Sequence, residues 1–580
     1  MALKWDKAKY PCRRKPLGKV QTRGAAMIPP VAGEVFINPM HVSIAYIGSS
    51  TLALQVALRH QTIFPPDMGS LGECREYDAI LIGAGFGGYT MLPKLRKLGL
   101  RAKIFERGSG SGGVWFLGQK LTIQDPGARV DSDSPAYQFF DREIWEDFTF
   151  SERFPGFREL QKYFQHVERK WDLRKDIEYH KSVTYAHWDP ESRRWVVGCS
   201  DGTTTRCKWL FANVGFAAKE YKPYLKGSAD FQGEMFHTAH WPDHDVALKD
   251  KRIAVIGTGA SGIQVIQEAG KLCKHLTVYQ RTPNFCLPMQ QRRLDPVEEQ
   301  RKKDSGLYEA AFKACEKTSA GVPYESNGRK TFDDTSEERE AYWNRLIQDG
   351  GFKFWVAGYD DLNLDQRAND AAYDFWRRMV LKRIKDPQKA RLLAPEVPPH
   401  PFGAKRPSLE QDYFEVLSQP NVDIVDLNEF PIQEVNATGI RTAAGQVDVD
   451  MIVLATGFDG LTGGFMDIDI QGVDRRTLKQ YWSDGVKTSM GVAIPGFPNL
   501  FFLFGPQAPS TFSNGPTCIQ FQGRWFEKLV QKMLDEGIET LEPKEEAADT
   551  WTEKIRERWE ATLLPQGKIS ISAAQKGVLH

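Results

Sequence analysis

Two glycine-rich turns, each between an apolar run and a helical pattern, constrain the fold of this chain more than any other feature. Gly83–Gly88 reads Gly-Ala-Gly-Phe-Gly-Gly, and Gly257–Gly262 reads Gly-Thr-Gly-Ala-Ser-Gly. In a βαβ unit such glycines let the backbone approach a pyrophosphate at the N-terminus of the helix. We therefore predict an α/β fold with two Rossmann-like dinucleotide-binding domains.

The strands that follow the two turns end on side chains of opposite charge. The first ends at Glu106 and the second at Arg281 and Thr282. The residue about 20 positions after such a turn contacts the adenosine ribose, where a carboxylate accepts from a free 2′-OH and an Arg meets a 2′-phosphate. The pattern predicts FAD at the first turn and NADPH at the second.

Length and composition describe an ordinary multidomain globular protein. The chain has 580 residues, of which 41% are hydrophobic and 26% charged, and its net charge is +1. A length of this order supports two or more domains. The near-neutral balance provides no bulk attraction to nucleic acid, so we expect no nucleic-acid partner.

Eight cysteines are scattered along the chain, at Cys12, Cys74, Cys199, Cys207, Cys273, Cys286, Cys315 and Cys518. None forms a CxxC pair, which argues against a redox dithiol and against a zinc site. We therefore expect no metal. Scattered cysteines are typical of a reducing compartment, and we expect the cytoplasm.

Residues 1–72 differ from the rest and are expected to form a poorly ordered N-terminal extension. Residues 1–30 carry many Lys and Arg but one acid, Asp6, and residues 35–58 carry no Asp, Glu, Lys or Arg. A basic stretch before an uncharged one is typical of a targeting or anchor segment. The polar residues within 35–58 favour surface packing, and membrane association through this segment is the alternative.

The remaining chain is predicted to form two discontinuous domains. Residues 73–222 would form the first part of the FAD-binding domain. Residues 223–415 would form the NADPH-binding domain, with a helical insertion at about 290–392 where apolar residues recur at helical spacing. Residues 416–580 would complete the FAD-binding domain and end in a tail, and we expect the apolar run 451–458 to rejoin that domain and approach FAD. The sequence does not specify an oligomeric state.

The segment between the two turns carries a longer motif. Phe231, Gly233 and His237 are followed by Trp241-Pro242-Asp243. This spacing resembles the FxGxxxHxxxWPD fingerprint of the Baeyer–Villiger monooxygenases, which are class B flavoprotein monooxygenases. The related N- and S-oxygenating group usually ends this motif in Tyr-Lys or Tyr-Arg. The resemblance runs from about residue 77 to 529 and implies that His237 positions the two nucleotide domains.

Two further segments resemble flavin-contacting motifs of that family. Gly112-Gly113-Val114-Trp115 is similar to its GGxW, and residues 126–131 are similar to its PGxxxD. The resemblance implies that Asp131, Ser132 and Tyr137 contact FAD. This chain departs from the family by an insertion at 116–125, which we expect to alter the geometry beside the flavin.

Residues 401–407 resemble the family segment that ends in Lys-Arg-Pro. The resemblance implies that Lys405 reaches the 2′-phosphate of NADP, that Arg406 stabilises a flavin peroxide, and that Asp131 braces Arg406. Arg406 and Asp131 are therefore the predicted catalytic residues. The segment 504–510 resembles a late family loop near the substrate.

The complete set of expected cofactor contacts follows from these motifs. For FAD they are Gly83, Gly85, Gly88, Glu106, Val114, Trp115, Arg129, Val130, Asp131, Ser132 and Tyr137. For NADPH they are Gly257, Thr258, Gly259, Ala260, Ser261, Gly262, Ile263, Gln264, Arg281, Thr282 and Lys405.

The activity implied by the resemblance is an FAD-dependent, NADPH-consuming oxygenation. One atom of O₂ would be inserted next to a ketone carbonyl through a C4a-peroxyflavin to give an ester or lactone. We expect a bulky ketone like those of secondary metabolism. Oxygenation of N or S, and an uncoupled NADPH oxidase-like flavoprotein, are the alternatives.

Overall fold

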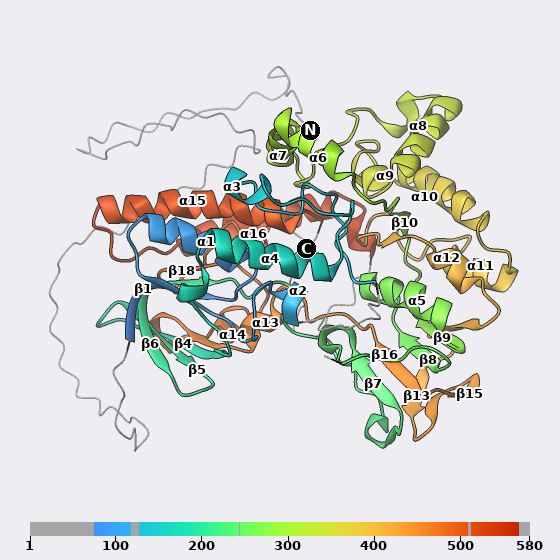
Figure 1. The fold of residues 1–580 in the computed structure, drawn as a ribbon, viewed down its shortest axis with the longest axis horizontal. Helices are drawn as coiled ribbons and strands as arrows, with labels where there is room; N and C mark the ends of the chain where they lie inside the picture. The colour runs from blue at the N-terminus through green and yellow to red at the C-terminus, as the bar shows by residue number, and fades with distance from the viewer. Residues whose placement is uncertain (1–74, 118–126, 243, 509–511, 568–580) are drawn as a thin grey trace, which may run out of the picture.

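The computed structural model describes residues 75–117, 127–242, 244–508 and 512–567 (Figure 1). The predictions for the N-terminal extension 1–72, for most of the insertion at 116–125 and for Asp243 lie outside the described residues. No helix within these ranges is long and apolar enough to cross a membrane.

The first sheet contains the strand that leads into the first glycine turn. Its order is β17-β4-β5-β6-β1-β2-β3, with β18 also paired to β6. The bounds are β1 (Arg75–Ile82), β2 (Ala102–Phe105), β3 (Ile177–Glu178), β4 (Val183–Asp189), β5 (Arg194–Cys199), β6 (Thr204–Ala212), β17 (Asp469–Gln471) and β18 (Leu500–Phe501). β4, β5 and β6 pair antiparallel, and the other pairs are parallel.

Alternate residues of β1 pack into two separate cores because successive side chains of a strand point to opposite faces. Ala79 and Leu81 face the helices, and Ile80 and Ile82 face β4, β5 and the segment around residues 461–502. Figure 1 shows α1, α4 and α15 on the helical side. The helices of this unit are α1 (Phe86–Lys97), α2 (Val114–Leu117), α3 (Arg142–Trp145), α4 (Phe157–Lys170), α13 (Gly463–Met466), α14 (Leu478–Tyr481), α15 (Gly515–Asp535) and α16 (Glu545–Glu560).

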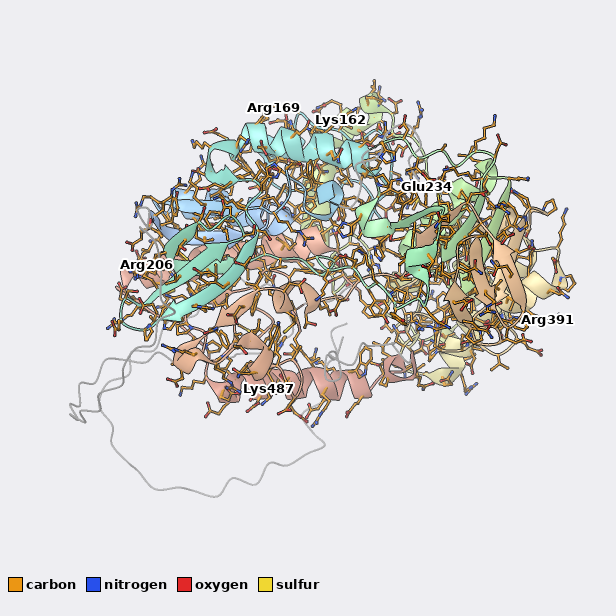
Figure 2. The ribbon with its side chains drawn as sticks, turned by 90° about the horizontal axis from the view of Figure 1, so that it is seen from below. Lys162, Arg169, Arg206, Glu234, Arg391 and Lys487 are labelled. Atoms are coloured by element: carbon orange, nitrogen blue, oxygen red, sulfur yellow. The ribbon has the colours of Figure 1, made fainter. Side chains whose placement is uncertain are left out.

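The second sheet is parallel throughout and contains the strand that leads into the second turn. Its order is β12-β9-β8-β16-β7. The bounds are β7 (Glu234–His237), β8 (Arg252–Ile256), β9 (His275–Gln280), β12 (Val422–Asp426) and β16 (Met451–Leu454), with α5 (Ala260–Leu272) and α12 (Tyr413–Leu417) packed beside them. An antiparallel meander of β13 (Ile432–Val435), β14 (Gly439–Thr442) and β15 (Gly445–Asp448) precedes β16. In Figure 2, Arg206 of β6 and Glu234 of β7 lie on different halves of the molecule.

The predicted domain boundary at 415 and the placement of the run 451–458 are wrong. β12 pairs with β9, and β16 pairs with both β8 and β7, so the second unit continues through β16. The first sheet is rejoined only at β17. A fully apolar strand fits the interior of any parallel sheet, and its pattern does not specify which sheet receives it.

The predicted helical insertion lies between β9 and β12. Its helices are α6 (Pro296–Asp304), α7 (Leu307–Cys315), α8 (Ser336–Asp349), α9 (Lys353–Val356), α10 (Gln366–Leu381) and α11 (Pro387–Leu393), and β10 (Leu287–Pro288) pairs with β11 (Leu409–Glu410) at its base. Asp295, Thr335, Asp365 and Asp386 cap four of these helices through their side chains, which satisfies free N–H groups at the helix starts.

Two buried cations attach this insertion to the first unit. Arg153 donates to Asp133 at 2.5 and 2.8 Å and to the carbonyl oxygen of Asp349 at 2.7 Å. Lys303 of α6, 3% exposed, donates to the carbonyl oxygen of Phe148 at 2.8 Å and to Oγ1 of Thr149 at 2.7 Å. Buried polar groups require such partners, so these contacts fix how the insertion sits on the first unit.

Lys303→Met is therefore expected to lower the free energy of unfolding by roughly 1–3 kcal/mol, because it leaves buried acceptors without a donor. Lys313→Met on the exposed face of α7 is the matched control. Denaturant unfolding of the two variants measures the difference. Equal midpoints and slopes for both would show that the Lys303 contacts contribute no stability.

Candidate functional site

The two glycine turns have the same local geometry. Gly83 and Gly257 have φ of +100° and +108°, which favours glycine. A Cβ at Gly88 would overlap the carbonyl oxygen of Gly83, and one at Gly262 would overlap that of Gly257. Each turn therefore holds its helix close to the preceding strand.

The N-termini of α1 and α5 remain available to an anion. Gly85 and Gly259 are the N-cap residues of the two helices, and among the described residues neither helix start receives a side-chain cap. A Cβ at Gly259 would meet no atom within 4 Å, so the backbone there faces open space. Uncapped N–H groups together with the helix dipole favour a pyrophosphate at both positions.

Glu106 lies at the end of β2, as predicted, and contacts the first turn directly. Its carboxylate accepts from the backbone N–H of Ala84 and of Gly108, each at 2.7 Å, and the residue is 3% exposed. A carboxylate has further acceptor positions for a hydroxyl. Its contact with a ribose stays a prediction.

Arg281, Thr282 and Lys405 gather beside the second turn. Oγ1 of Thr258 donates to the carbonyl oxygen of Thr282 at 2.9 Å, which ties the turn to the strand end. Burial and, after it, the positive charge of Arg281 lower the pKa of Lys405. Two cations near enough to act on each other form a suitable place for a dianionic phosphate.

Asp131 and Arg406 form the ion pair that the motifs implied. Nε and Nη2 of Arg406 donate to Oδ2 of Asp131 at 3.1 and 2.9 Å. The guanidinium carbon also lies 4.5 Å from the ring centroid of Phe352 and 6.0 Å from that of Trp355. Asp131 and two aromatic rings at the start of α9 therefore orient this cation, and its catalytic role stays a prediction.

Trp115 and Tyr137 are beside this pair. Nε1 of Trp115 donates to the hydroxyl of Tyr137 at 3.1 Å, and the rings meet edge to face at 5.9 Å. Burial raises the pKa of Tyr137. The negative charge of Asp131 also raises this pKa, and the positive charge of Arg406 lowers it. The aromatic residues predicted on the flavin side thus lie next to the predicted catalytic pair.

The two nucleotide units meet where the loop at 127–132 lies on α5. Nε2 of Gln264 donates to the carbonyl oxygen of Arg129 at 3.1 Å. The Arg129 side chain donates to Glu152 at 2.9 Å and to the carbonyl oxygen of Phe154 at 3.1 Å. Gln264 and Arg129 therefore join the units, and direct cofactor contacts by them stay predictions.

Three residues predicted to contact a cofactor are buried. Val130 and Ser132 are 2% exposed, and Ile263 is fully buried. The backbone N–H groups of Val130 and Ile263 already donate to Pro155 and Gly259. The apolar side chains of Val130 and Ile263 pack in the core, and contact of these residues with a cofactor stays a prediction. Val114, in contrast, is 43% exposed.

His237 ends β7 and is buried beside β16. Its Nδ1 accepts from the backbone N–H of Ala239 at 3.0 Å, which leaves the proton of the neutral ring on Nε2. Within the described residues, Nε2 has no hydrogen-bond partner. Burial lowers the pKa of His237, so the neutral form is favoured. Positioning of the domains by His237 stays a prediction.

Two asparagines at the site were not predicted. Asn213 follows β6, is 9% exposed, and lies against Gly87 of the first turn; its amide atoms have no partner within the described part of the chain. Asn284 donates to the carbonyl oxygen of Thr258 at 3.1 Å and accepts from the N–H of Ser408 at 3.1 Å. The end of a buried strand is a signal that would have identified Asn213. No sequence signal identifies Asn284, Phe352 or Trp355.

Comparison with known proteins agrees with this geometry. The family described as Flavin-binding monooxygenase-like matches residues 78–296. Cyclopentanone 1,2-monooxygenase of Comamonas sp. (strain NCIMB 9872) is 41% identical over 85% of this chain and 88% of its own. The crystal structure of OTEMO with FAD and NADP superposes with a TM-score of 0.81 at 34% identity, over 85% of this chain and 92% of that one. The chain belongs to the flavin-binding monooxygenases, among the Baeyer–Villiger enzymes.

One member with a different printed activity is also similar. Phenazine N-monooxygenase PhzNO1 of Lysobacter antibioticus is 35% identical over 85% of this chain and 89% of its own. Similarity across this family of flavin-binding monooxygenases therefore includes proteins that oxygenate nitrogen.

Proposed function

We propose that this flavoprotein consumes NADPH and inserts one oxygen atom of O₂ next to a ketone carbonyl to give an ester or lactone. The observation that carries the proposal is the Arg406 guanidinium, held by Asp131 beside Trp115 and Tyr137. The similarity to cyclopentanone 1,2-monooxygenase and to OTEMO with FAD and NADP supports it.

FAD fits the first unit. The start of α1 suits the pyrophosphate, Glu106 suits the ribose, and the amide of Asn213, which has no partner in the described part of the chain, lies against the same turn. NADPH fits the second unit, where the start of α5 suits the pyrophosphate and Arg281 and Lys405 suit the 2′-phosphate. When bound, NADPH supplies the hydride and reduced FAD activates O₂.

Arg406 supplies a fixed positive charge where the substrate oxygen becomes negative. Attack on a ketone carbonyl converts its oxygen into an alkoxide, and a preorganised donor stabilises that charge without reorganising. An arginine stays protonated and presents several N–H groups in one plane. Asp131 accepts from Nε and Nη2 of Arg406, which holds the guanidinium in one orientation.

The aromatic residues around Arg406 suit a bulky, apolar ketone. Phe352 and Trp355 border the guanidinium, and Trp355 contacts Phe512 with ring centroids 5.4 Å apart. Apolar walls exclude water, which keeps the charge of Arg406 effective. We propose a ketone of the size found in secondary metabolites.

The affinity for NADP⁺ is expected to fall as pH rises, and to begin falling at a lower pH than it would if Lys405 had the usual pKa of a lysine. A bound 2′-phosphate favours protonated Lys405, whose pKa in the free protein is lowered by burial and by Arg281. Binding therefore weakens as pH rises through this lowered pKa. Calorimetric titration with NADP⁺ and with NAD⁺ across pH 7–10 measures it, as the difference between the two coenzymes isolates the phosphate.

Arg281→Ala should shift this pH dependence upward, because it removes the neighbouring cation. A profile that is flat up to pH 10, or the same profile for NADP⁺ and NAD⁺, would contradict the assignment of Lys405.

The function is tested with purified, yellow protein, NADPH and a panel of ketones from cyclopentanone to steroid-sized rings. Mass spectrometry should detect a product heavier by one oxygen, with ¹⁸O incorporated from ¹⁸O₂ and NADPH consumed in proportion. An amine and a thioether are included in the panel. Oxygenation of these alone would favour N- or S-oxygenation, and H₂O₂ as the only product would favour an uncoupled oxidase.

We propose that the protein works in the cytoplasm. Cys199, Cys207, Cys273, Cys286 and Cys315 are buried free thiols, and Cys518 is also free. Free cysteines are typical of a reducing compartment. Membrane association through residues 35–58 remains the alternative, and the two are separated by fractionation of cells that express the full chain.

A further inference from the structure

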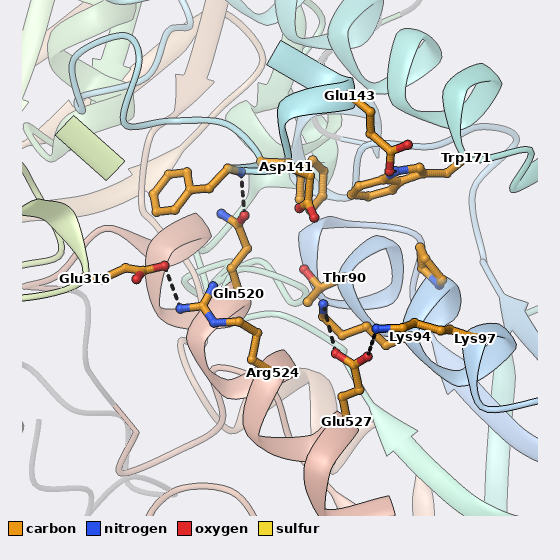
Figure 3. A pocket seen from close by; sticks show the side chains of 13 residues that line it. Thr90, Lys94, Lys97, Asp141, Glu143, Trp171, Glu316, Gln520, Arg524 and Glu527 are labelled. Carbon is orange, nitrogen blue, oxygen red and sulfur yellow. Dashed lines mark hydrogen bonds and ion pairs between the residues drawn. The ribbon is translucent and has the colours of Figure 1, made fainter. Parts of the chain in front are cut away.

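A pocket of about 370 Å³ lies between the C-terminal half of α1, the start of α3 and α15 (Figure 3). None of the predicted cofactor or catalytic residues lines it. Its apolar walls are Pro93, Phe139, Phe140 and Trp171, and the rings of Phe139 and Trp171 meet at 4.9 Å. The pocket is therefore a separate feature from the flavin site.

The cations of the pocket already pair with acids from the same walls. Lys94 and Lys97 pair with Glu527 at 3.5 and 2.9 Å, and Arg524 pairs with Glu316 at 2.6 Å. These pairs appear as dashed lines in Figure 3. Two further acids, Asp141 and Glu143, line the pocket, so its lining has four acids against three cations and a small excess of negative charge.

Asp141 is the acid best placed to receive a ligand. It precedes α3, yet its carboxylate does not accept from the N–H groups of that helix. Asp141 is exposed. Desolvation raises the pKa of its carboxyl, and the positive charges of Lys94 and Arg524 act against that shift and favour the ionised form that would pair with a cation. Glu143, in contrast, already accepts from Nε1 of Trp171 at 2.5 Å.

Thr90 provides an independent indication of a ligand. It is 3% exposed and lines the pocket, and its hydroxyl has no hydrogen-bond partner within the described residues. Its methyl group packs against Gly523 of α15, where a Cβ would overlap it. A buried hydroxyl without a partner is costly, and a ligand atom in the pocket would satisfy it.

We propose that this pocket binds a small organic cation with an aromatic or aliphatic body. Its ammonium group pairs with Asp141, its body packs on Phe139, Phe140 and Trp171, and a polar atom near the ammonium bonds the Thr90 hydroxyl. An ammonium over aromatic rings and beside a carboxylate gains from both charge and apolar burial.

The test is calorimetric titration of the FAD-loaded full-length protein with 2-amino-1-phenylethanol. Its protonated amine matches Asp141, its hydroxyl matches Thr90, and its ring matches the aromatic residues of the pocket. Asp141→Asn should weaken binding about tenfold or more, since it removes a charge-assisted hydrogen bond. Thr90→Val keeps the shape of the side chain and should weaken binding severalfold. Glu191→Gln, an exposed acid elsewhere, should change nothing.

Two further titrations separate this pocket from the flavin site. Arg406→Ala should leave amine binding unchanged, and phenylacetate, an anion of similar shape, should not bind the pocket. Flavin absorbance and basal NADPH oxidation show that each pocket variant is folded. Absence of binding at millimolar amine, equal affinity in Asp141→Asn, or equal affinity for phenylacetate would overturn the proposal.

Discussion

Arg406→Ala is expected to lower ester formation by at least about ten- to a hundredfold while FAD stays bound and NADPH still reduces it. The guanidinium is the cation held beside the predicted flavin residues by Asp131. A charge-assisted hydrogen bond contributes about 1.5–3 kcal/mol, and about 1.4 kcal/mol corresponds to a tenfold change in rate. Ester output and NADPH consumption, measured together on one ketone, give the coupling efficiency.

Two variants separate the charge of Arg406 from its orientation. Arg406→Lys keeps a positive charge but loses the planar set of donors, and Asp131→Asn keeps the guanidinium but removes its ion-pair partner. Both should retain more ester formation than Arg406→Ala, with more NADPH lost to H₂O₂. Ester output from Arg406→Ala equal to that of the wild type would remove this residue from the mechanism.

Lys405→Ala and Arg281→Ala are each expected to raise KM for NADPH by about ten- to a hundredfold and to leave KM for NADH nearly unchanged. Each variant removes one of the two cations proposed to hold the 2′-phosphate, which NADH lacks. Steady-state kinetics with both coenzymes, on one ketone at saturation, measures the change. The wild type should prefer NADPH by a comparable factor.

Arg391→Ala, on the exposed surface of the same unit, controls for a general loss of positive charge (Figure 2). It should leave both KM values unchanged. Equal kcat/KM for NADPH and NADH in the wild type would mean that neither Lys405 nor Arg281 selects the coenzyme.

Local motifs predicted the parts of the site that depend on short stretches of chain. The positive φ of Gly83 and Gly257 and the close packing at Gly88 and Gly262 follow from the need for a tight turn between strand and helix. The position of Glu106 at a strand end follows from the same unit. The helical insertion was predicted because its apolar residues recur at helical spacing.

Contacts between segments far apart in the chain could be predicted only where a family motif indicated them. The Asp131–Arg406 pair spans 275 positions and was expected from the resemblance. Phe352 and Trp355, which also orient Arg406, lie outside these motifs. Asn284 likewise contacts Thr258 and Ser408 through the fold alone.

The sequence by itself determined that two dinucleotide units exist, where each begins, and which charged side chain follows the second strand of each, because these properties depend on neighbours in the chain. Only the tertiary structure decided that β16 completes the second sheet, that Val130 and Ile263 pack in the core, and which aromatic rings enclose Arg406. An apolar residue is compatible with many buried environments, and its partner is selected by how whole sheets and helices pack.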